Sequence, residues 1–270
     1  MLSDTSLKWI SSAILCSAIL RLSTLKRTKR KLFIYWEQGW DEAPMLCRCC
    51  LRSWEKYNRD TWEIVKLDRA NTSQYIDMVR LVPNYWEITP IASRSDILRI
   101  NLLNTYENCL WVDATLFCTM PLDRWIHHYP TFFAFSNPTP TRKISSWFMF
   151  NRKRNYLVET YCKTYNAYWR TRNQPENYFQ FHIIFNELYL SDPEFKRAWD
   201  EVPNKLPASL PHALKFQEAI ETIPESKKKH IMERKSPCYK LDHNSNKETG
   251  VLQDPTNAFG FLIRAHDVML

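Results

Sequence analysis

Strand-like and helix-like segments alternate along the first half of the chain, and this alternation restricts the fold more than any other feature. Residues 31–36 and 61–67 have the short apolar or alternating pattern of β-strands. Residues 43–57 and 93–106 have the length and the start signals of α-helices. Further strand patterns occur at residues 110–113, 132–135 and 147–150. Such alternation predicts an α/β fold in which a mainly parallel sheet is flanked by helices.

The second half of the chain is predicted to be mostly helical. Helical patterns cover residues 154–169, 177–190 and 194–199, and residues 237–241 form a candidate last strand. No internal repeat, low-complexity linker or composition change marks a domain boundary. We therefore expect one α/β domain over residues 31–270, preceded by a separate N-terminal segment, residues 1–30.

Composition narrows the function classes. Only 3 of the 270 residues are glycine, which excludes the glycine-rich loops that bind phosphates in dinucleotide and P-loop folds. The net charge of +8 favours anionic partners, namely nucleotides, nucleic acid or an acidic membrane surface. No nucleic-acid recognition motif occurs, so we expect no nucleic-acid partner. Cys47, Cys49 and Cys50 cluster, but without a second cluster they are expected to be core or surface thiols rather than zinc ligands.

The N-terminal segment combines an apolar stretch with a basic run. Residues 9–20 are apolar, but a membrane span needs about 20 such residues. Residues 26–31 follow with five basic side chains in six positions. Two interpretations stay open: a terminal helix packed on the domain, or a helix lying on an anionic membrane through residues 9–31. Without a secretory signal, we expect a cytoplasmic protein, with peripheral contact at the inner face of the membrane under the second interpretation.

The segment from residue 95 to residue 122 carries the strongest functional signal. A predicted amphipathic helix is followed by a short apolar strand that ends in Asp113. Ligands of open α/β sheets bind at the carboxyl ends of strands, and an acidic residue there can hold a metal-bound diphosphate. Asp96 and Arg99 are three residues apart, which puts them on one helix face. By spacing alone they could equally be a surface ion pair.

The residues of this segment resemble those of the capsular polysaccharide synthesis proteins and of glycosyltransferase family 32, which are DXD-type sugar-nucleotide transferases. The resemblance implies a GT-A fold: a Rossmann-like mixed sheet flanked by helices, with a helical C-terminal half. The matching positions are Ser95, Asp96, Arg99, Leu102, Leu103, Tyr106, Trp111, Asp113, Ala114 and Thr115.

Three more segments extend the resemblance to about residues 31–245. The first is the turn Trp36-Glu37-Gln38-Gly39 after the first predicted strand, and the second is the Tyr-Phe-x-x-His-x-x-Phe pattern of residues 178–185. The third is the closing segment from residue 237 to His243, which contains Lys240. The combination is far more specific than any one segment.

The resemblance implies a retaining glycosyltransferase that moves a sugar from a nucleotide donor, with UDP as the expected nucleotide. The acceptor would be a glycan or a lipid-linked glycan in capsular or cell-surface polysaccharide synthesis. Expected catalytic residues are Asp113, Asp96 and Arg99, and expected donor contacts are Trp36, Gln38, Gly39, Ser95, Trp111, Ala114 and Lys240. Tyr178 and His182 are expected in an acceptor or sugar pocket. Asp113, Thr115 and His243 are the expected ligands of Mn²⁺ or Mg²⁺.

Some of these residues have equally ordinary interpretations, and the pattern departs from the family at two points. Trp36 could fill the core, and His182 and His243 could be structural. Glu107 and Asn108 replace the usual glycine pair, although asparagine tolerates the positive φ of such a turn. Thr115 replaces the second metal-binding aspartate, and a hydroxyl is a weaker ligand. The alternative function is therefore a non-catalytic basic protein with a degenerate transferase fold that binds nucleotides, membranes or nucleic acid.

Overall fold

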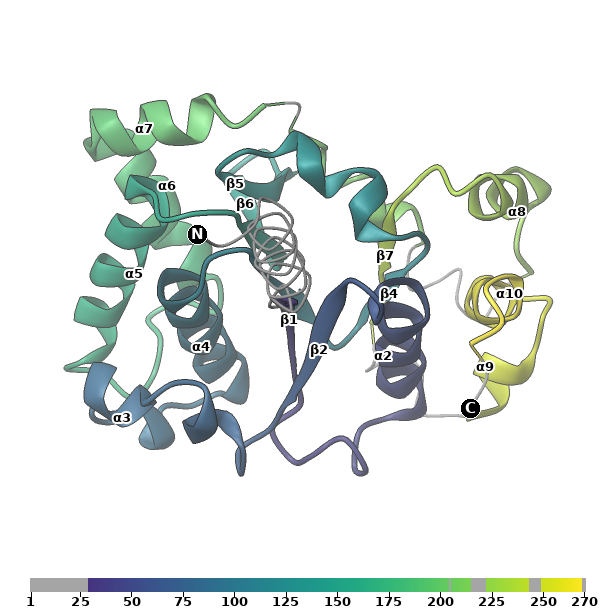
Figure 1. The fold of residues 1–270 in the computed structure, drawn as a ribbon, viewed down its shortest axis with the longest axis horizontal. Helices are drawn as coiled ribbons and strands as arrows, with labels where there is room; N and C mark the ends of the chain where they lie inside the picture. The colour runs from purple at the N-terminus through teal and green to yellow at the C-terminus, as the bar shows by residue number, and fades with distance from the viewer. Residues whose placement is uncertain (1–28, 204, 215–221, 243–248, 269–270) are drawn as a thin grey trace, which may run out of the picture.

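The computed structural model describes residues 29–203, 205–214, 222–242 and 249–268 (Figure 1). The predicted N-terminal helix and residues 26–28 of the basic run lie outside these residues, as does His243. The membrane interpretation of residues 9–31 therefore stays a prediction. Within the described part of the chain, no helix has the length and apolar character needed to cross a membrane.

The centre of the molecule is a five-stranded sheet in the order β2-β1-β3-β6-β5. β1 runs parallel to both of its neighbours, whereas β6 is antiparallel to β3 and to β5. The mixed sheet expected of the fold is thus confirmed, but the prediction of a mainly parallel sheet holds only for β1, β2 and β3. The strands are β1 (Arg30–Tyr35), β2 (Trp62–Leu67), β3 (Cys109–Asp113), β5 (Phe132–Thr139) and β6 (Arg142–Asn151).

The antiparallel pairing of β6 with β5 has a simple physical cause. β5 and β6 are joined by only two residues, and so short a connection can only reverse the chain into an antiparallel hairpin. The strands predicted at residues 132–135 and 147–150 are the apolar inner ends of this hairpin. Its outer ends are more polar and lack the apolar signal. They extend the hairpin beyond the core toward the cavity described below.

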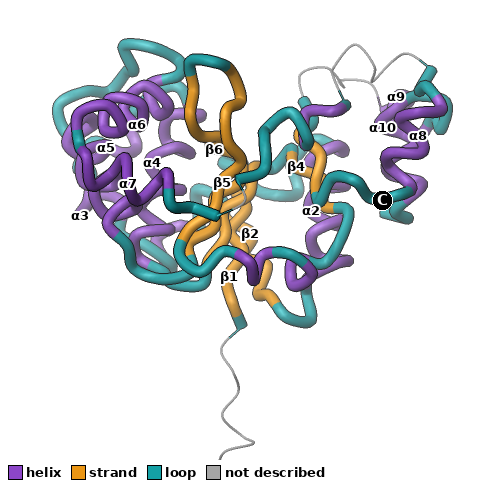
Figure 2. The backbone as a smooth tube through the Cα atoms, turned by 90° about the horizontal axis from the view of Figure 1, so that it is seen from above, coloured by secondary structure: helices purple, strands orange, loops and turns teal. Residues whose placement is uncertain are grey.

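Helices cover both faces of the sheet (Figures 1 and 2). Helices α3 to α7 lie on one side, and α2 lies on the other with α8 to α10 beyond it. The helical second half is confirmed for α5, α6 and α7, whereas α8 to α10 follow weak sequence signals and were not predicted. The helices are α2 (Met45–Asn58), α3 (Met78–Leu81), α4 (Ile91–Thr105), α5 (Tyr156–Trp169), α6 (Gln180–Ser191), α7 (Pro193–Asp200), α8 (Glu225–Met232), α9 (Thr249–Gln253) and α10 (Ala258–Ala265).

A second, smaller sheet joins the middle of the chain to its C-terminal part. β4 (Leu116–Cys118) pairs antiparallel with β7 (Cys238–Lys240), and Leu116 lies opposite Lys240 in the register. Helix α2 contributes to the main core through Cys47 and Trp54 and to a second apolar cluster through Leu46. The second cluster packs the C-terminal helices against α2 and β4. This pairing brings residues 240–242 next to the end of β3.

Helix α4 is buried on nearly all sides, which corrects the prediction of an amphipathic helix. Every residue from Ile97 to Leu103 is buried, because α4 packs against β3 and β6 on one side and against α5 on another. A helix surrounded in this way needs no polar stripe. Asn108, just after α4, has a φ of 50°, so the expected turn with positive φ is present without glycine.

The seven cysteines among the described residues are buried free thiols. This confirms the core interpretation of Cys47, Cys49 and Cys50. Burial raises the pKa of the Cys47 thiol to about 12 and that of Cys49 to about 11, which disfavours the thiolate that a metal requires.

Candidate active site

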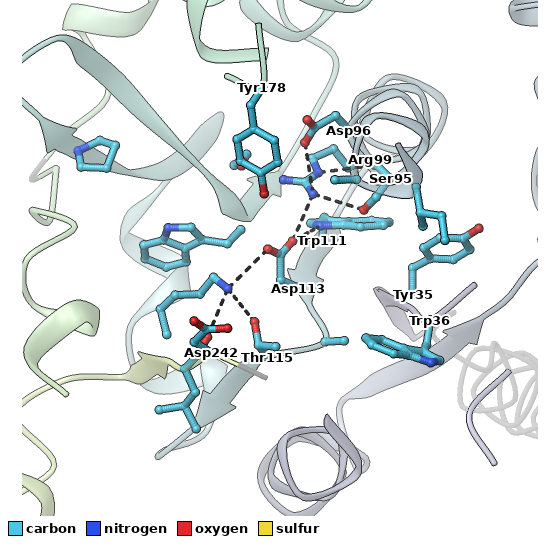
Figure 3. Close-up of a pocket in the computed structure, with 18 of the residues that line it drawn as sticks. Tyr35, Trp36, Ser95, Asp96, Arg99, Trp111, Asp113, Thr115, Tyr178 and Asp242 are labelled. Atoms are coloured by element: carbon cyan, nitrogen blue, oxygen red, sulfur yellow. Dashed lines mark hydrogen bonds and ion pairs between the residues drawn. The ribbon is translucent and has the colours of Figure 1, made fainter. Parts of the chain in front are cut away.

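A cavity of about 940 Å³ opens at the carboxyl ends of β1 and β3. Tyr35 and Asp113, the last residues of these two parallel strands, are direct partners in the register. Because parallel strands end at the same edge, their following turns form the floor of the cavity. The walls come from α4, the β5–β6 hairpin, the start of α6 and the segment after β7 (Figure 3). The predicted residues that line it are Trp36, Gln38, Ser95, Asp96, Arg99, Trp111, Asp113, Ala114, Thr115, Tyr178, His182 and Lys240.

Asp113 is at the centre of this arrangement. The β3 residues before it are buried, whereas the Asp113 side chain is 25% exposed. Oδ1 accepts a hydrogen bond from Trp111 Nε1 at 3.1 Å and lies 3.2 Å from Arg99 Nη2. Burial would raise the pKa of this carboxyl, but Arg99, Lys240 and the Trp111 hydrogen bond outweigh it and lower the pKa below its ordinary value. Asp113 is therefore a stable anion.

Arg99 joins the two acidic residues of the site. Its guanidinium, only 5% exposed, lies 3.2 Å from Asp96 and 3.2 Å from Asp113, which confirms the shared helix face. It also donates to Ser95 Oγ and covers the Trp111 ring, with Cζ 5.2 Å from the ring centroid. Nη1 is buried and has no hydrogen-bond partner among the described residues. Because an unpaired buried donor is costly, this atom favours an acceptor supplied by a ligand.

Asp96 differs from Asp113 in its electrostatics although both contact the same arginine. The Asp96 side chain is 17% exposed. Burial raises its pKa to about 6, with a further increase from the Asp113 charge, and Arg99 offsets this only in part. At neutral pH most of Asp96 is ionised, so it can accept hydrogen bonds from a ligand hydroxyl group.

Lys240 approaches the site from the second sheet. Its Nζ donates to Thr115 Oγ1 at 2.5 Å and lies 3.8 Å from Asp113 Oδ2. The dashed lines in Figure 3 show both interactions meeting at one ammonium group. Thr115 is thus paired with a cation, and Asp242 lines the cavity close by. Lys240 and Thr115 are 125 residues apart, so no local pattern could have predicted their contact.

The turn after β1 lines part of the cavity and also contains one partner of a buried ion pair. Trp36 is half-buried, and it both packs against the main core and lines the cavity. Gly39 does not line the cavity; it closes the turn with its N–H donated to the Trp36 carbonyl and has a φ of 98°, which favours glycine. Glu37 pairs with Arg94 of α4 and fixes the turn against that helix. No local sequence pattern predicts this pair.

The opposite wall is formed by the start of α6 and the β5–β6 hairpin. Tyr178 is 70% exposed and points into the cavity (Figure 3), and Phe179 lies under the Arg142 guanidinium, 4.1 Å from Cζ to the ring centroid. Burial, with Arg142 and Arg99 nearby, lowers the pKa of His182 to about 3. His182 is therefore neutral, and its Nδ1 has no partner among the described residues.

Trp147 and His212 are among the cavity residues that were not predicted. Trp147 of β6 stacks on Phe135 and contacts His212 edge to face, with ring centroids 5.4 Å apart. Burial and the nearby Lys240 lower the pKa of His212 to about 4, so this ring is neutral as well. A tryptophan within an apolar strand pattern carries no signal that separates a cavity residue from a core residue. Only the tertiary contact between Trp147 and His212 distinguishes the two cases.

The residues around Asp113 fit a divalent cation poorly. Among the described residues, no group of three or more His, Cys, Asp or Glu side chains could hold a metal ion. Of the predicted ligands, Thr115 accepts a hydrogen bond from Lys240, and Asp113 is flanked by Arg99 and Lys240. His243 lies outside the described residues. Two of the three expected metal ligands thus have cationic partners within the protein.

Comparison with known proteins identifies a family. The sequence matches the family model described as "Capsular polysaccharide synthesis protein" over residues 9–253. No curated protein was matched. One similar solved structure is titled "PaToxG Glycosyltransferase"; it is 14% identical with a TM-score of 0.46, and the match covers 67% of this chain and 81% of that one. At this identity and score, the structural likeness carries no inference about activity.

Proposed function

The chain belongs to the capsular polysaccharide synthesis protein family, and on this premise we propose that it is a glycosyltransferase. It moves a sugar from a nucleoside diphosphate donor, UDP in our proposal, to a glycan or lipid-linked glycan acceptor. One observation carries the proposal: a carboxylate at the end of a buried strand, flanked by Arg99 and Lys240, faces a cavity of about 940 Å³. That volume suits a ligand of nucleotide-sugar size.

The sugar and the diphosphate would contact different parts of the cavity. Asp96 and the unpaired Nη1 of Arg99 supply an acceptor and a donor for sugar hydroxyl groups. Lys240 supplies positive charge for the diphosphate. Trp36 and Gln38, in the turn after β1, line the part of the cavity proposed for the nucleotide. Trp111 is only 1% exposed, so we assign it the role of holding Arg99 and Asp113 in place.

In the proposed transfer, the bond between the sugar C1 and the diphosphate oxygen breaks, and its electron pair stays on that oxygen. The acceptor hydroxyl oxygen forms the new bond to C1, and its proton passes to the departing diphosphate. We propose retention of configuration, with the acceptor entering on the face that the diphosphate leaves. Asp96 and Asp113 both contact Arg99, which supports a role in orienting the sugar rather than in nucleophilic attack.

The acceptor is proposed to lie against the wall opposite Trp36. Tyr178 and Phe179 are exposed aromatic residues, and Ile91 adds an exposed aliphatic group at the cavity mouth. Sugar rings present an apolar C–H face that packs on aromatic rings, whereas their hydroxyl groups seek polar partners. The neutral His182 at the base of this wall offers such a partner.

A donor-hydrolysis and binding assay tests the proposal. Purified protein is titrated with several nucleoside diphosphates and their sugar conjugates, with and without manganese, and release of the nucleotide is followed. We expect one conjugate to be hydrolysed, and we expect Asp113→Asn to abolish this turnover while its thermal melt stays close to that of the wild type.

Two outcomes would contradict the proposal. Full turnover by Asp113→Asn would remove the site assignment. Failure of every nucleotide to bind, and of every conjugate to react, would instead favour the non-catalytic alternative.

A further inference from the structure

We propose that the ammonium group of Lys240 takes the role that a divalent cation plays beside an Asp-x-Asp pair, so that diphosphate binding in this protein does not need a metal ion. The inference rests on the proposed function, because it concerns the diphosphate half of the donor. Two of the expected metal ligands, Asp113 and Thr115, have cationic side chains as partners instead.

Lys240 contacts two of the three side chains that were expected to bind the metal ion, Thr115 and Asp113. Its Nζ is 2.5 Å from Thr115 Oγ1 and 3.8 Å from Asp113 Oδ2. The replacement of an aspartate by threonine removes one negative charge, and the lysine adds one positive charge at the same place. A hard divalent cation prefers several anionic oxygens, whereas one carboxylate and one hydroxyl are a sufficient environment for an ammonium group.

The backbone on both sides of this contact is fixed. Lys240 is the last residue of β7 and pairs with Leu116 of β4, one residue after Thr115. The next residue, Leu241, donates its N–H to the Thr115 carbonyl at 3.0 Å. The side chain of Lys240 is 21% exposed, so its stem is packed while the ammonium reaches the cavity. The second sheet therefore fixes the contact between Lys240 and Thr115, whereas a lysine on the open surface would be free to move.

The ammonium also keeps bonding capacity for a ligand. It has three N–H groups. One is donated to Thr115, the Leu241 carbonyl lies at 3.4 Å, and Asp113 is at ion-pair rather than hydrogen-bond distance. A diphosphate oxygen that enters the cavity can thus receive a charge-assisted hydrogen bond from Lys240. When the sugar–oxygen bond breaks, the same ammonium stabilises the charge that stays on the departing diphosphate.

Calorimetric titration of the full chain with UDP, in EDTA and in manganese, tests this inference. We expect the wild type to bind UDP in EDTA with a dissociation constant within about threefold of that in manganese, less than one hydrogen bond to a charged group contributes. Lys240→Met should weaken binding in EDTA by at least about tenfold, in line with loss of such a bond. Lys235→Met, which changes an exposed lysine paired with Glu233 outside the cavity, should leave it unchanged.

A double variant supplies the converse result. Thr115→Asp combined with Lys240→Met restores two carboxylates and removes the ammonium, so its UDP binding should require manganese. Lys240→Arg keeps the positive charge and should retain metal-free binding, which separates a charge effect from a folding defect of Lys240→Met.

The outcomes distinguish the inference from the function on which it rests. UDP binding by the wild type only in the presence of manganese would overturn the role of Lys240 but leave the proposed transferase intact. Equal binding by wild type and a folded Lys240→Met in EDTA would overturn it as well. Absence of UDP binding by the wild type in both buffers would overturn the proposed use of UDP itself.

Discussion

Two arginines on helix α4, Arg94 and Arg99, are both buried and both paired with carboxylates, yet their surroundings differ. Each nitrogen of the Arg94 guanidinium has a partner: two bond to Glu37, and the third bonds to the Ile88 carbonyl. Glu37 in turn accepts from Tyr35 at 2.8 Å. Arg99 contacts Asp96 and Asp113, but its Nη1 has no partner among the described residues, and both carboxylates are partly exposed to the cavity.

The difference separates a structural ion pair from a candidate binding group on the same helix. A buried pair whose hydrogen bonds are all made inside the protein has nothing left to offer a ligand, and removing one partner leaves an uncompensated buried charge. A pair with an unmade hydrogen bond beside a cavity still has a donor to offer a ligand. Both arginines occur within six residues of sequence, so residue type and spacing do not distinguish them.

The largest effect on stability is expected when Arg94 is removed. Arg94→Met removes the buried cation beside Glu37 and leaves Arg69, a more exposed side chain 3.5 Å away, as the remaining ion-pair partner. The free energy of unfolding should therefore fall by about 3 kcal/mol, the low end of the range for a broken buried ion pair. Urea denaturation measures the change. The matched control is Glu37→Met combined with Arg94→Met, which removes both charges and should recover much of the loss. A fully stable Arg94→Met protein would show that the pair is not structural.

Removal of Arg99 should act mainly on activity. Arg99→Met takes away a preorganised donor in the cavity, and loss of such a donor reduces turnover by about 10²–10³-fold. Its effect on unfolding should be smaller than that of Arg94→Met, because Asp96 and Asp113 are 17% and 25% exposed and can be partly hydrated. Initial rates and urea curves of the two variants would be compared directly. The comparison fails if Arg99→Met is the less stable protein.

Asp96 should contribute to recognition of the sugar rather than of the nucleotide. Asp96→Ala removes the acceptor for a sugar hydroxyl group and should raise the transition-state free energy by about 1–3 kcal/mol, the range for a buried polar group left unpaired. Affinity for the free nucleoside diphosphate should hardly change, since that ligand lacks the sugar. Calorimetry gives the affinity, and initial rates give kcat/KM. An equal fall of both quantities in a well-folded variant would move Asp96 to the nucleotide.

The smallest effect expected is a pH dependence that separates Asp96 from Asp113. With a pKa of about 6, Asp96 ionises between pH 5 and 7, so kcat/KM should rise about tenfold over this range if the anion is required. Asp113, whose pKa is lowered, stays ionised throughout. The rise should be absent in Asp96→Asn. A pH profile of that variant identical to the wild-type profile would assign the titration to another group.

The pH dependence of stability provides an independent check of the raised pKa of Asp96. The pKa of Asp96 is higher in the folded protein than its ordinary value of 3.8. Between these two values the native state binds more protons than the unfolded state, so this contribution to stability falls as pH rises from about 4 to 6. Urea denaturation at several pH values should show the fall in the wild type and not in Asp96→Asn.

Local patterns were sufficient to predict the centre of the fold. The apolar run before Asp113 predicted the buried strand β3, and the three-residue spacing of Asp96 and Arg99 predicted their shared helix face. Both inferences depend only on the period of a helix or strand. Twelve of the site residues that the family resemblance implied line the cavity. Their individual roles stay predictions.

Local sequence patterns did not predict contacts between distant segments, nor elements whose apolar pattern is weak. The polar outer ends of the β5–β6 hairpin hid its length, and the three-residue strand β4 is too short to have a period. The small second apolar cluster supports α8 to α10 without long apolar stripes. Glu37 and Arg94 are 57 residues apart, and nothing local indicates that they pair.

The sequence by itself therefore determined an α/β chain with an acidic strand end and an Asp–Arg helix face, because periodicity is a local property. Only the tertiary structure decided what surrounds that strand end. The pairing of β4 with β7 brings Lys240 to Thr115. The packing of α4 gives every guanidinium nitrogen of Arg94 a partner, whereas one nitrogen of Arg99, which lines the cavity, has none among the described residues. Charge and hydrogen bonding at the site depend on such long-range neighbours, and these exist only once the chain has folded.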